Sequence, residues 1–409
     1  MPPFRKLTAA ILASAALYTT PASAQTLEDL QSRLFDHPSL TAMRQNSDAE
    51  RDRSIAARAL PDPVISVGVN NFPIADPSFD AFVPTNTSFG VRQQIPNGSL
   101  RRARSSEATR RAVLSDVAMT MQYANLQADL YTALIEKRRI AEQSAFAQAQ
   151  NEKYDALADV VASEIDAGRP AVFRLAEIDV ERAGVARRLA DLVGQRARAD
   201  AQLINLVGSA PDMTPPLMIP ADWAGDAKTF HLVQVAEAGV DVSDARIDQA
   251  RAAFKPELGV QFNYQLRQEG SGAPTEMFAG DDFVSGMVTF TVPLWASRSQ
   301  KPRLRAAQSE RAAARSRSMN AARRGAAEYA SYQAMRLAAE DAIGILNRQI
   351  AAIDDQMTAQ LTTYESGVGD YSPIIDGEIA ILSLKSEIAI EKARRDTAIA
   401  RMNALLVTP

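Results

Sequence analysis

An alternating segment at residues 257–267 constrains the fold of this chain more than any other stretch. Apolar side chains occupy every second position of it, at Leu258, Val260, Phe262, Tyr264 and Leu266. A period of two gives a β-strand one apolar and one polar face. A second run of this kind covers residues 283–292, and its apolar face holds Val284, Val288, Phe290 and Val292. About ten residues is also the length of a tilted transmembrane β-strand.

Almost everything around these two strands has the sequence of long, alanine-rich, charged helices, and only 6% of the residues are aromatic. From Leu100 to about Asp166 there is neither a proline nor a cluster of turn residues. A helix of that length extends roughly 100 Å, at about 1.5 Å per residue. Gly168-Arg169-Pro170 interrupts it, and residues 171–207 predict a second helix that returns alongside the first. The chain therefore contains a very long helical hairpin.

The order helix, strand, loop, strand, long helix, turn, long helix occurs twice. Corresponding breaks in the two copies lie 194 to 199 residues apart, from His37 and His231 at one end to Gly168 and Gly367 at the other. We therefore divide the chain into a first repeat at 25–207, a connector at 208–229 and a second repeat at 230–409. The expected strands are 64–72, 85–95, 257–267 and 283–292, and the two helical tips are expected near 167–170 and 367–373.

Residues 1–24 have the pattern of a Sec-type signal peptide. Arg5 and Lys6 precede an apolar run, and the small residues Ala22 and Ala24 form a cleavage site before Gln25. The sequence contains no cysteine, which excludes disulfides, thiolate metal sites and N-terminal lipidation. We therefore expect an exported, unlipidated protein that begins near Gln25. Beyond residue 24 no apolar run approaches the roughly eighteen residues of a helical membrane span, so membrane insertion would use the strands.

Four amphipathic strands are too few to close a membrane barrel. The smallest membrane barrels have about eight strands, and each unpaired backbone group at an open edge in lipid costs several kcal/mol. Copies of this chain are therefore expected to pool their strands in an oligomer. In that oligomer six apolar side chains are expected to face lipid: Leu258, Val260, Phe262, Tyr264, Val288 and Phe290.

The sequence holds no residue pattern for catalysis or for binding a cofactor or metal. His-Glu-x-x-His and Gly-x-Ser-x-Gly motifs are missing, and Gly367-Val368-Gly369 lacks the third glycine of a dinucleotide loop. We interpret His37 and His231 as structural residues at helix starts rather than as metal ligands. The sequence thus predicts neither an enzyme nor a cofactor, and no nucleic-acid partner.

The whole pattern resembles the TolC-like outer membrane efflux proteins. The matching motifs are His37-Pro38-Ser39-Leu40, Leu60-Pro61, Gln94-Ile95-Pro96, Thr291-Val292-Pro293-Leu294 and Tyr364-Glu365-Ser366-Gly367. The resemblance implies a mostly α-helical homotrimer in the bacterial outer membrane, with four strands per protomer in a shared twelve-stranded barrel and a long α-helical tunnel in the periplasm. It also implies a passive exit channel whose partners are a periplasmic adaptor (membrane fusion) protein and an inner membrane transporter.

Two segments are similar to the heavy-metal branch of that family: Leu60-Pro61-Asp62-Pro63 before the first strand, and Arg101-Arg102-Ala103-Arg104 after the second. This similarity implies export of copper, silver, zinc or cobalt cations with an inner membrane transporter of the RND type. Drug export and type I secretion use the same architecture and stay open as alternatives. A periplasmic coiled-coil scaffold would share the long helices but would leave the four strands unexplained.

The resemblance also assigns roles to the two tips. Six residues are expected to contact the adaptor: Gly168, Arg169, Pro170, Gly367, Val368 and Gly369. Four are expected to form the periplasmic gate: Tyr364, Asp370, Asp376 and Arg174. Threefold symmetry would turn one carboxylate into an acidic ring, whereas the alternative is an acidic cap on the returning helix. Arg174 replaces the aspartate of some relatives and is expected to pair with Asp370 or Asp376.

Basic residues follow the second strand of each repeat, at Arg101, Arg102 and Arg104 and at Arg298, Lys301, Arg303 and Arg305. They are expected where the barrel meets the periplasm. Two interpretations stay open at this point. One is anchoring of the chain at the membrane edge, and the other is an ordinary solvated face.

Overall fold

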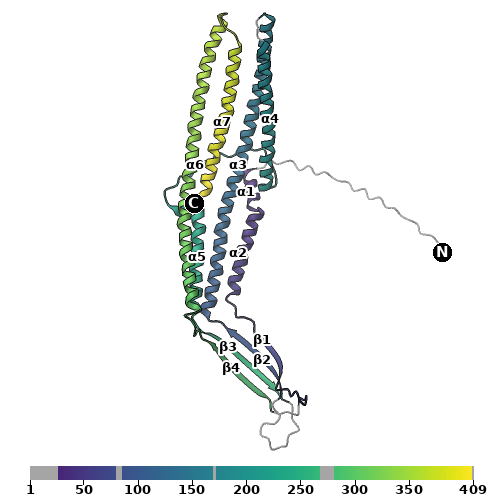
Figure 1. Cartoon of the computed structure of the whole chain (residues 1–409), viewed down its shortest axis with the longest axis vertical. Coiled ribbons are helices and arrows are strands. Elements are labelled where there is room, and N and C mark those ends of the chain that lie inside the picture. The colour runs from purple at the N-terminus through teal and green to yellow at the C-terminus, as the bar shows by residue number, and fades with distance from the viewer. Residues whose placement is uncertain (1–25, 80–84, 169–171, 268–280, 408–409) are drawn as a thin grey trace, which may run out of the picture.

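The computed structural model describes residues 26–79, 85–168, 172–267 and 281–407, and the molecule is elongated, with a sheet at one end (Figure 1). The first repeat contains α1 (Leu27–Phe35), α2 (Pro38–Ala56), β1 (Val64–Asn70), β2 (Asn86–Ile95), α3 (Gly98–Asp166) and α4 (Val172–Val207). The connector and the second repeat contain η1 (Ala227–Thr229), α5 (His231–Ala252), β3 (Glu257–Leu266), β4 (Phe283–Thr291), α6 (Gln300–Glu365) and α7 (Ser372–Leu405). The predicted signal peptide and the tip residues Arg169 and Pro170 lie outside the described residues.

The elements follow the predicted order, and their ends differ from the predicted ends by a few residues. The helical region before the first strand is divided into α1 and α2, because Pro38 has no N–H with which to continue a helix. The Nδ1 atom of His37 accepts a hydrogen bond from the Ser39 N–H and caps the new helix. This helical region ends at Ala56, a few residues before Pro61.

The two histidines occupy different positions in their repeats. His37 is the N-cap of α2, whereas the N-cap of α5 is Phe230 and His231 is already the first helical residue. Their predicted equivalence is therefore wrong by one residue, because the second repeat uses the cap position to bury the Phe230 ring completely. Burial lowers the pKa of His231 below its usual value, and a hydrogen bond with the backbone of Leu406 opposes that shift.

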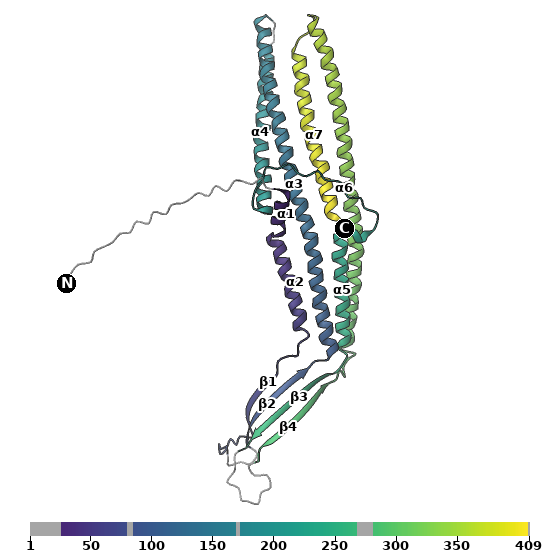
Figure 2. The ribbon, with the colours of Figure 1, turned by 180° about the vertical axis from the view of Figure 1, so that it is seen from behind.

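Two long helical hairpins form the body of the molecule, α3 with α4 and α6 with α7 (Figure 1). Figure 2 shows from behind that α3 and α7 lie side by side, so the hairpins of the two repeats are in contact. In the half nearer the sheet, α2 packs on α3, and α5 packs on both α3 and α6. The helix α3 has 69 residues and is therefore about 100 Å long. It continues from the sheet to the tip.

Polar contacts join α3 and α7 along their length. These contacts are Asp129–Arg401, Arg138–Asp396, Gln143–Ser386, Gln150–Ser383 and Lys153–Glu378. Each contact requires one particular partner, because a charged or hydrogen-bonding group loses its partner when a helix slides. The set therefore determines the register between the two repeats.

The apolar core is divided into several clusters along the helices. One joins α1, α2, α3 and α4 near the middle of the molecule, a second joins the start of α5 to α6 and the end of α7, and a third joins α3, α4 and α7 near the tips. Each cluster has fully buried members, for example Leu130 in the first, Phe230 in the second and Val161 in the third. Because the molecule is long and thin, its core is not continuous, and each cluster stabilises only the part of the helices that surrounds it.

The sheet has the order β1–β2–β3–β4 and is antiparallel throughout. The pairing of β2 with β3 joins the strands of the two repeats into one sheet. One row across the sheet contains Val67, Phe89, Tyr264 and Val284. Within the described part of the chain, the outer edges of β1 and β4 have no strand partner. Such edges are sites for pairing with another chain.

Gly325 on α6 provides a test of the second cluster. A Cβ atom at this position would lie 2.8 Å from Cδ2 of Phe230, and the Phe230 ring is fully buried against Trp223, with the ring centroids 4.9 Å apart. We expect Gly325→Ala to destabilise the protein by about 1–3 kcal/mol, because the ring has no space into which it can move. Thermal unfolding of the detergent-solubilised protein, followed by circular dichroism, measures the change.

Gly344 on the same helix is the matched control. An added Cβ there would make only an ordinary contact, 3.8 Å from Nη1 of Arg348. Gly344→Ala should therefore stabilise the helix slightly, by up to about 1 kcal/mol. Equal effects of the two substitutions would show that the Phe230 contact does not determine the stability of this region.

Candidate functional site: the strand sheet and the helical tips

The sheet has one apolar face that the rest of the described chain leaves exposed. All six residues predicted to face lipid lie on it, since the register places Leu258 opposite Phe290 and Val260 opposite Val288. The Phe262 and Phe290 side chains are 51% and 66% exposed. A continuous apolar face of this kind indicates a surface that contacts lipid or another protein.

The opposite face of the sheet is polar, and its side chains form hydrogen bonds both between strands and along β3. Arg92 Nε donates to Gln261 Oε1 at 2.9 Å, and Gln261 Nε2 donates to Asn263 Oδ1 at 3.1 Å. Gly90 lies beneath this network, where a Cβ atom would come within 2.5 Å of both Asn263 Oδ1 and Ser66 Oγ. The contacts join residues of both repeats into one polar surface, which suits contact with water.

The second tip is a short turn closed by backbone hydrogen bonds. Gly367 has a φ of +79°, a conformation that favours glycine, and its N–H donates to the Tyr364 carbonyl at 2.9 Å. The rings of Tyr364 and Tyr371 lie 5.2 Å apart across the turn. Val368 at its apex is 84% exposed. Sequence reasoning did not include Tyr371, although two tyrosines that flank a glycine turn could have indicated the contact.

The first tip begins in the same way as the second. Gly168 follows α3 with a φ of +83°, and its N–H donates to the Ile165 carbonyl at 2.9 Å. Among the described residues, nothing lies within 4 Å of where its Cβ would be. The described part of this tip is exposed.

An ion pair joins the two tips within one chain. Nη2 of Arg174, near the start of α4, contacts the Asp376 carboxylate in the first turns of α7. Both side chains are partly exposed, at 34% and 47%. The Asp376 charge is therefore balanced by a cation of the same chain. An acidic ring built from Asp376 would be correspondingly weakened while this pair is formed.

The structure shows no further chemical centre among the residues it describes. No group of three or more metal-ligating side chains gathers within the described ranges. None of the described helices is both long and apolar enough to cross a membrane. The two histidines belong to separate helices, α2 and α5.

Comparisons with known proteins agree with this architecture. The family profile named outer membrane efflux protein matches residues 230–407, which is the second repeat. The fold is similar to that of CusC, with a TM-score of 0.77 and 15% identity over 100% of this chain and 99% of that chain. No curated protein sequence matches the chain.

Two further solved structures have the same fold. The outer membrane protein VceC from Vibrio cholerae is 14% identical over 92% of this chain and 95% of its own, with a TM-score of 0.73. The open state of the MtrE outer membrane channel from Neisseria gonorrhoeae is 18% identical over 93% of this chain and 88% of its own, with a TM-score of 0.72. The two hairpins and four strands thus have the same fold as these solved outer membrane proteins. The profile match adds a similarity in sequence, confined to the second repeat, to the outer membrane efflux proteins.

The Arg174–Asp376 pair yields a prediction about the gate. If the pair holds the tips together, Arg174→Ala and Asp376→Ala should raise the open probability of single channels in planar bilayers to a similar extent, because each removes the same contact. If Asp376 instead acts through an acidic ring, Asp376→Ala should lower cation selectivity, and Arg174→Ala should raise it by freeing the carboxylate.

Arg182→Ala is the matched control, because Arg182 pairs with Asp155 at 2.8 Å, so that this ion pair lies within the first hairpin. It should leave the single-channel record unchanged. Records that are identical for all three variants and the unmodified protein would exclude both roles for the pair.

Proposed function

We propose that this protein is the exit channel of a tripartite efflux pump in the bacterial outer membrane. Three copies would join their sheets edge to edge into a twelve-stranded barrel, with β4 of one copy beside β1 of the next. The observation that carries the proposal is the sheet itself, with one exposed apolar face and two outer edges that lack a partner in the described chain. In lipid such edges require other copies of the chain.

The helical body supports the same proposal. A helix of about 100 Å would extend far into the periplasm, and the exposed tips at Gly168 and at 367–369 would receive the adaptor protein. No nucleotide-binding pattern occurs in the sequence, so the energy would come from an inner membrane transporter, for which the heavy-metal similarity favours the RND type. The channel would be a passive conduit.

The cargo is the finer part of the proposal. The resemblance of the segments at 60–63 and 101–104 favours heavy-metal cations, and drug export and type I secretion are the alternatives. The neighbouring structures do not discriminate between these cargoes, because likeness at 14–18% identity concerns the fold alone.

A pair of adjacent substitutions in β3 tests the orientation of the sheet in the membrane. Phe262→Arg places a charge on the apolar face and should cost about 2–4 kcal/mol at the membrane midplane. It should therefore strongly reduce the amount of trimer in the outer membrane fraction. Asn263→Arg places the same charge on the polar face and should leave that amount nearly unchanged. A trimer yield that falls equally for both variants would contradict the proposed orientation.

Deletion of the gene tests the cargo. We expect the deletion strain to become sensitive to copper, silver, zinc or cobalt, and the intact gene should restore resistance whereas the Phe262→Arg gene should not. Susceptibility is measured in parallel for these metals and for a panel of drugs. Sensitivity to drugs together with unchanged resistance to metals would contradict the heavy-metal assignment while leaving the channel proposal intact.

A further inference from the structure

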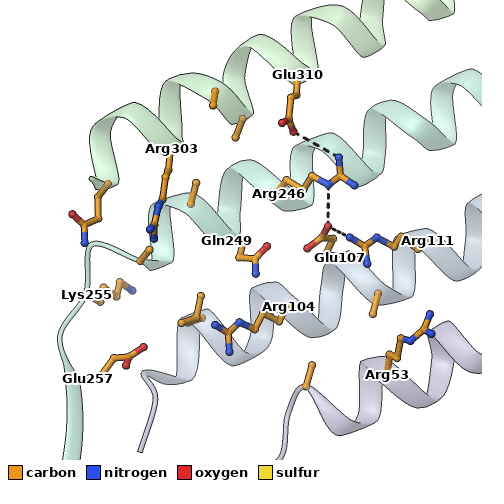
Figure 3. A pocket seen from close by; sticks show the side chains of 18 of the residues that line it. Arg53, Arg104, Glu107, Arg111, Arg246, Gln249, Lys255, Glu257, Arg303 and Glu310 are labelled. Atoms are coloured by element: carbon orange, nitrogen blue, oxygen red, sulfur yellow. Dashed lines mark hydrogen bonds and ion pairs between the residues drawn. The ribbon is translucent and has the colours of Figure 1, made fainter. Parts of the chain in front are cut away.

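A cavity of about 1010 Å³ lies where the helices meet the strands. Side chains from α2, α3, α5 and α6 line it, together with residues at the ends of β3 and β4 (Figure 3). The two clusters of basic residues that follow β2 and β4 in the sequence lie in this region, and Arg104 and Arg303 from them line the cavity. Membrane-edge anchoring and an ordinary solvated face were the two interpretations of these residues, and the structure adds that some of them line a cavity.

The cavity opens on the polar side of the sheet. Two of its lining residues, Glu257 and Thr291, are paired across β3 and β4. Glu257 lies on the same face of β3 as Gln261 and Asn263, because side chains alternate along a strand. This is the face opposite Phe262. In the proposed barrel, where the apolar face contacts lipid, the cavity would therefore open on the interior of the channel.

Most of the acidic side chains around the cavity are already paired. Glu107 is 8% exposed and contacts both Arg111 and Arg246, the latter at 2.9 Å (Figure 3). Arg246 also reaches Glu310 at 3.6 Å. A further pair joins the lining residues Glu50 and Arg53 at 2.6 Å. Three of the four glutamates that line the cavity thus form ion pairs with arginines that also line it. The fourth glutamate is Glu257.

Three cations that line the cavity have no such partner. Arg104 comes from α3, Lys255 from the segment after α5, and Arg303 from α6 (Figure 3). Within the described ranges, none of them has a carboxylate within 4.0 Å. All three are exposed to solvent. Six lining cations and four lining carboxylates leave a formal charge of 6 − 4 = +2 on the cavity wall.

We propose that this cavity binds multivalent anions that carry carboxylate or phosphate groups. Guanidinium groups bind such anions through paired hydrogen bonds, and three unpaired cations from three segments converge on a hollow large enough for a small organic anion. The proposal rests on the proposed function for its site in the channel. There, three copies would supply 3 × 3 = 9 such cations around one pore, whose concave wall would concentrate the field.

The cavity therefore selects cargo by charge. Anionic solutes would be held and passed at this level, whereas a hydrated divalent metal cation would be repelled. A metal would cross it as an anionic complex, for example with a polycarboxylate. This inference revises the cargo class within the proposed function: it favours acidic organic solutes and chelated metals in place of the free heavy-metal cations that the resemblance of residues 60–63 and 101–104 favours.

Planar bilayer recordings with potassium citrate as the probe test the inference. We expect citrate to block the potassium chloride current of the unmodified channel. In the double variant Arg104→Gln, Arg303→Gln the half-blocking citrate concentration should rise at least about tenfold, because two charge-assisted contacts are removed and the loss of one alone has about that effect. The matched double variant Arg102→Gln, Arg305→Gln removes the same charge from the same two helices outside the cavity and should behave like the unmodified channel.

Three other results would have distinct meanings. Absence of citrate block in the unmodified channel, or equal block in both double variants, would overturn the anion site. If the unmodified protein forms no channel, the proposed function fails rather than the site, and calorimetric titration of citrate into the detergent-solubilised protein then tests the site directly. In that titration, citrate binding that is lost in Arg104→Gln, Arg303→Gln and kept in Arg102→Gln, Arg305→Gln would support the site. Arg104→Lys, Arg303→Lys should retain part of the binding, since the charge remains while the paired hydrogen bonds are lost.

Discussion

The backbone hydrogen bonds at the two outer edges of the sheet are the constraint on which the rest of the structure depends. β1 and β4 each present a row of N–H and C=O groups that no described segment of the chain pairs. In water those groups can bind solvent, but in lipid they have no substitute for another strand. In the proposed barrel one chain is therefore an incomplete unit, and its long helices would be part of a larger assembly around a shared axis.

Within one chain, the two repeats are joined at both ends of the molecule. β2 pairs with β3 at one end, and Arg174 contacts Asp376 at the other. Between them, the polar contacts of α3 with α7 hold the hairpins in register. This distribution suits a thin molecule, because its separate apolar clusters stabilise only local levels. In one of these clusters the ring of Phe230 packs tightly against Gly325, where an added Cβ would lie 2.8 Å from it.

Charge pairing differs between the tips and the junction of helices and strands. At the tips, Asp376 is balanced by Arg174. At the junction, the glutamates other than Glu257 are engaged by arginines of the same wall, and Arg104, Lys255 and Arg303 are left over. The same residue types therefore give a neutral contact in one place and an excess of positive charge in the other. The excess, rather than the number of arginines, is what an anion would recognise.

Local patterns in the sequence determined the elements of this protein. The alternation at 257–267 and the helix breaks at Pro38, Gly168 and Gly367 act within a few residues, so they could be read without the fold. Tertiary structure alone decided which distant groups meet. In the folded chain Arg174 pairs with Asp376. His37 caps one helix, whereas His231 is the first residue of another. Arg104 and Arg303 line the same cavity. Those outcomes depend on the rotation and register of packed helices, and a shift of one residue turns a side chain by about 100°.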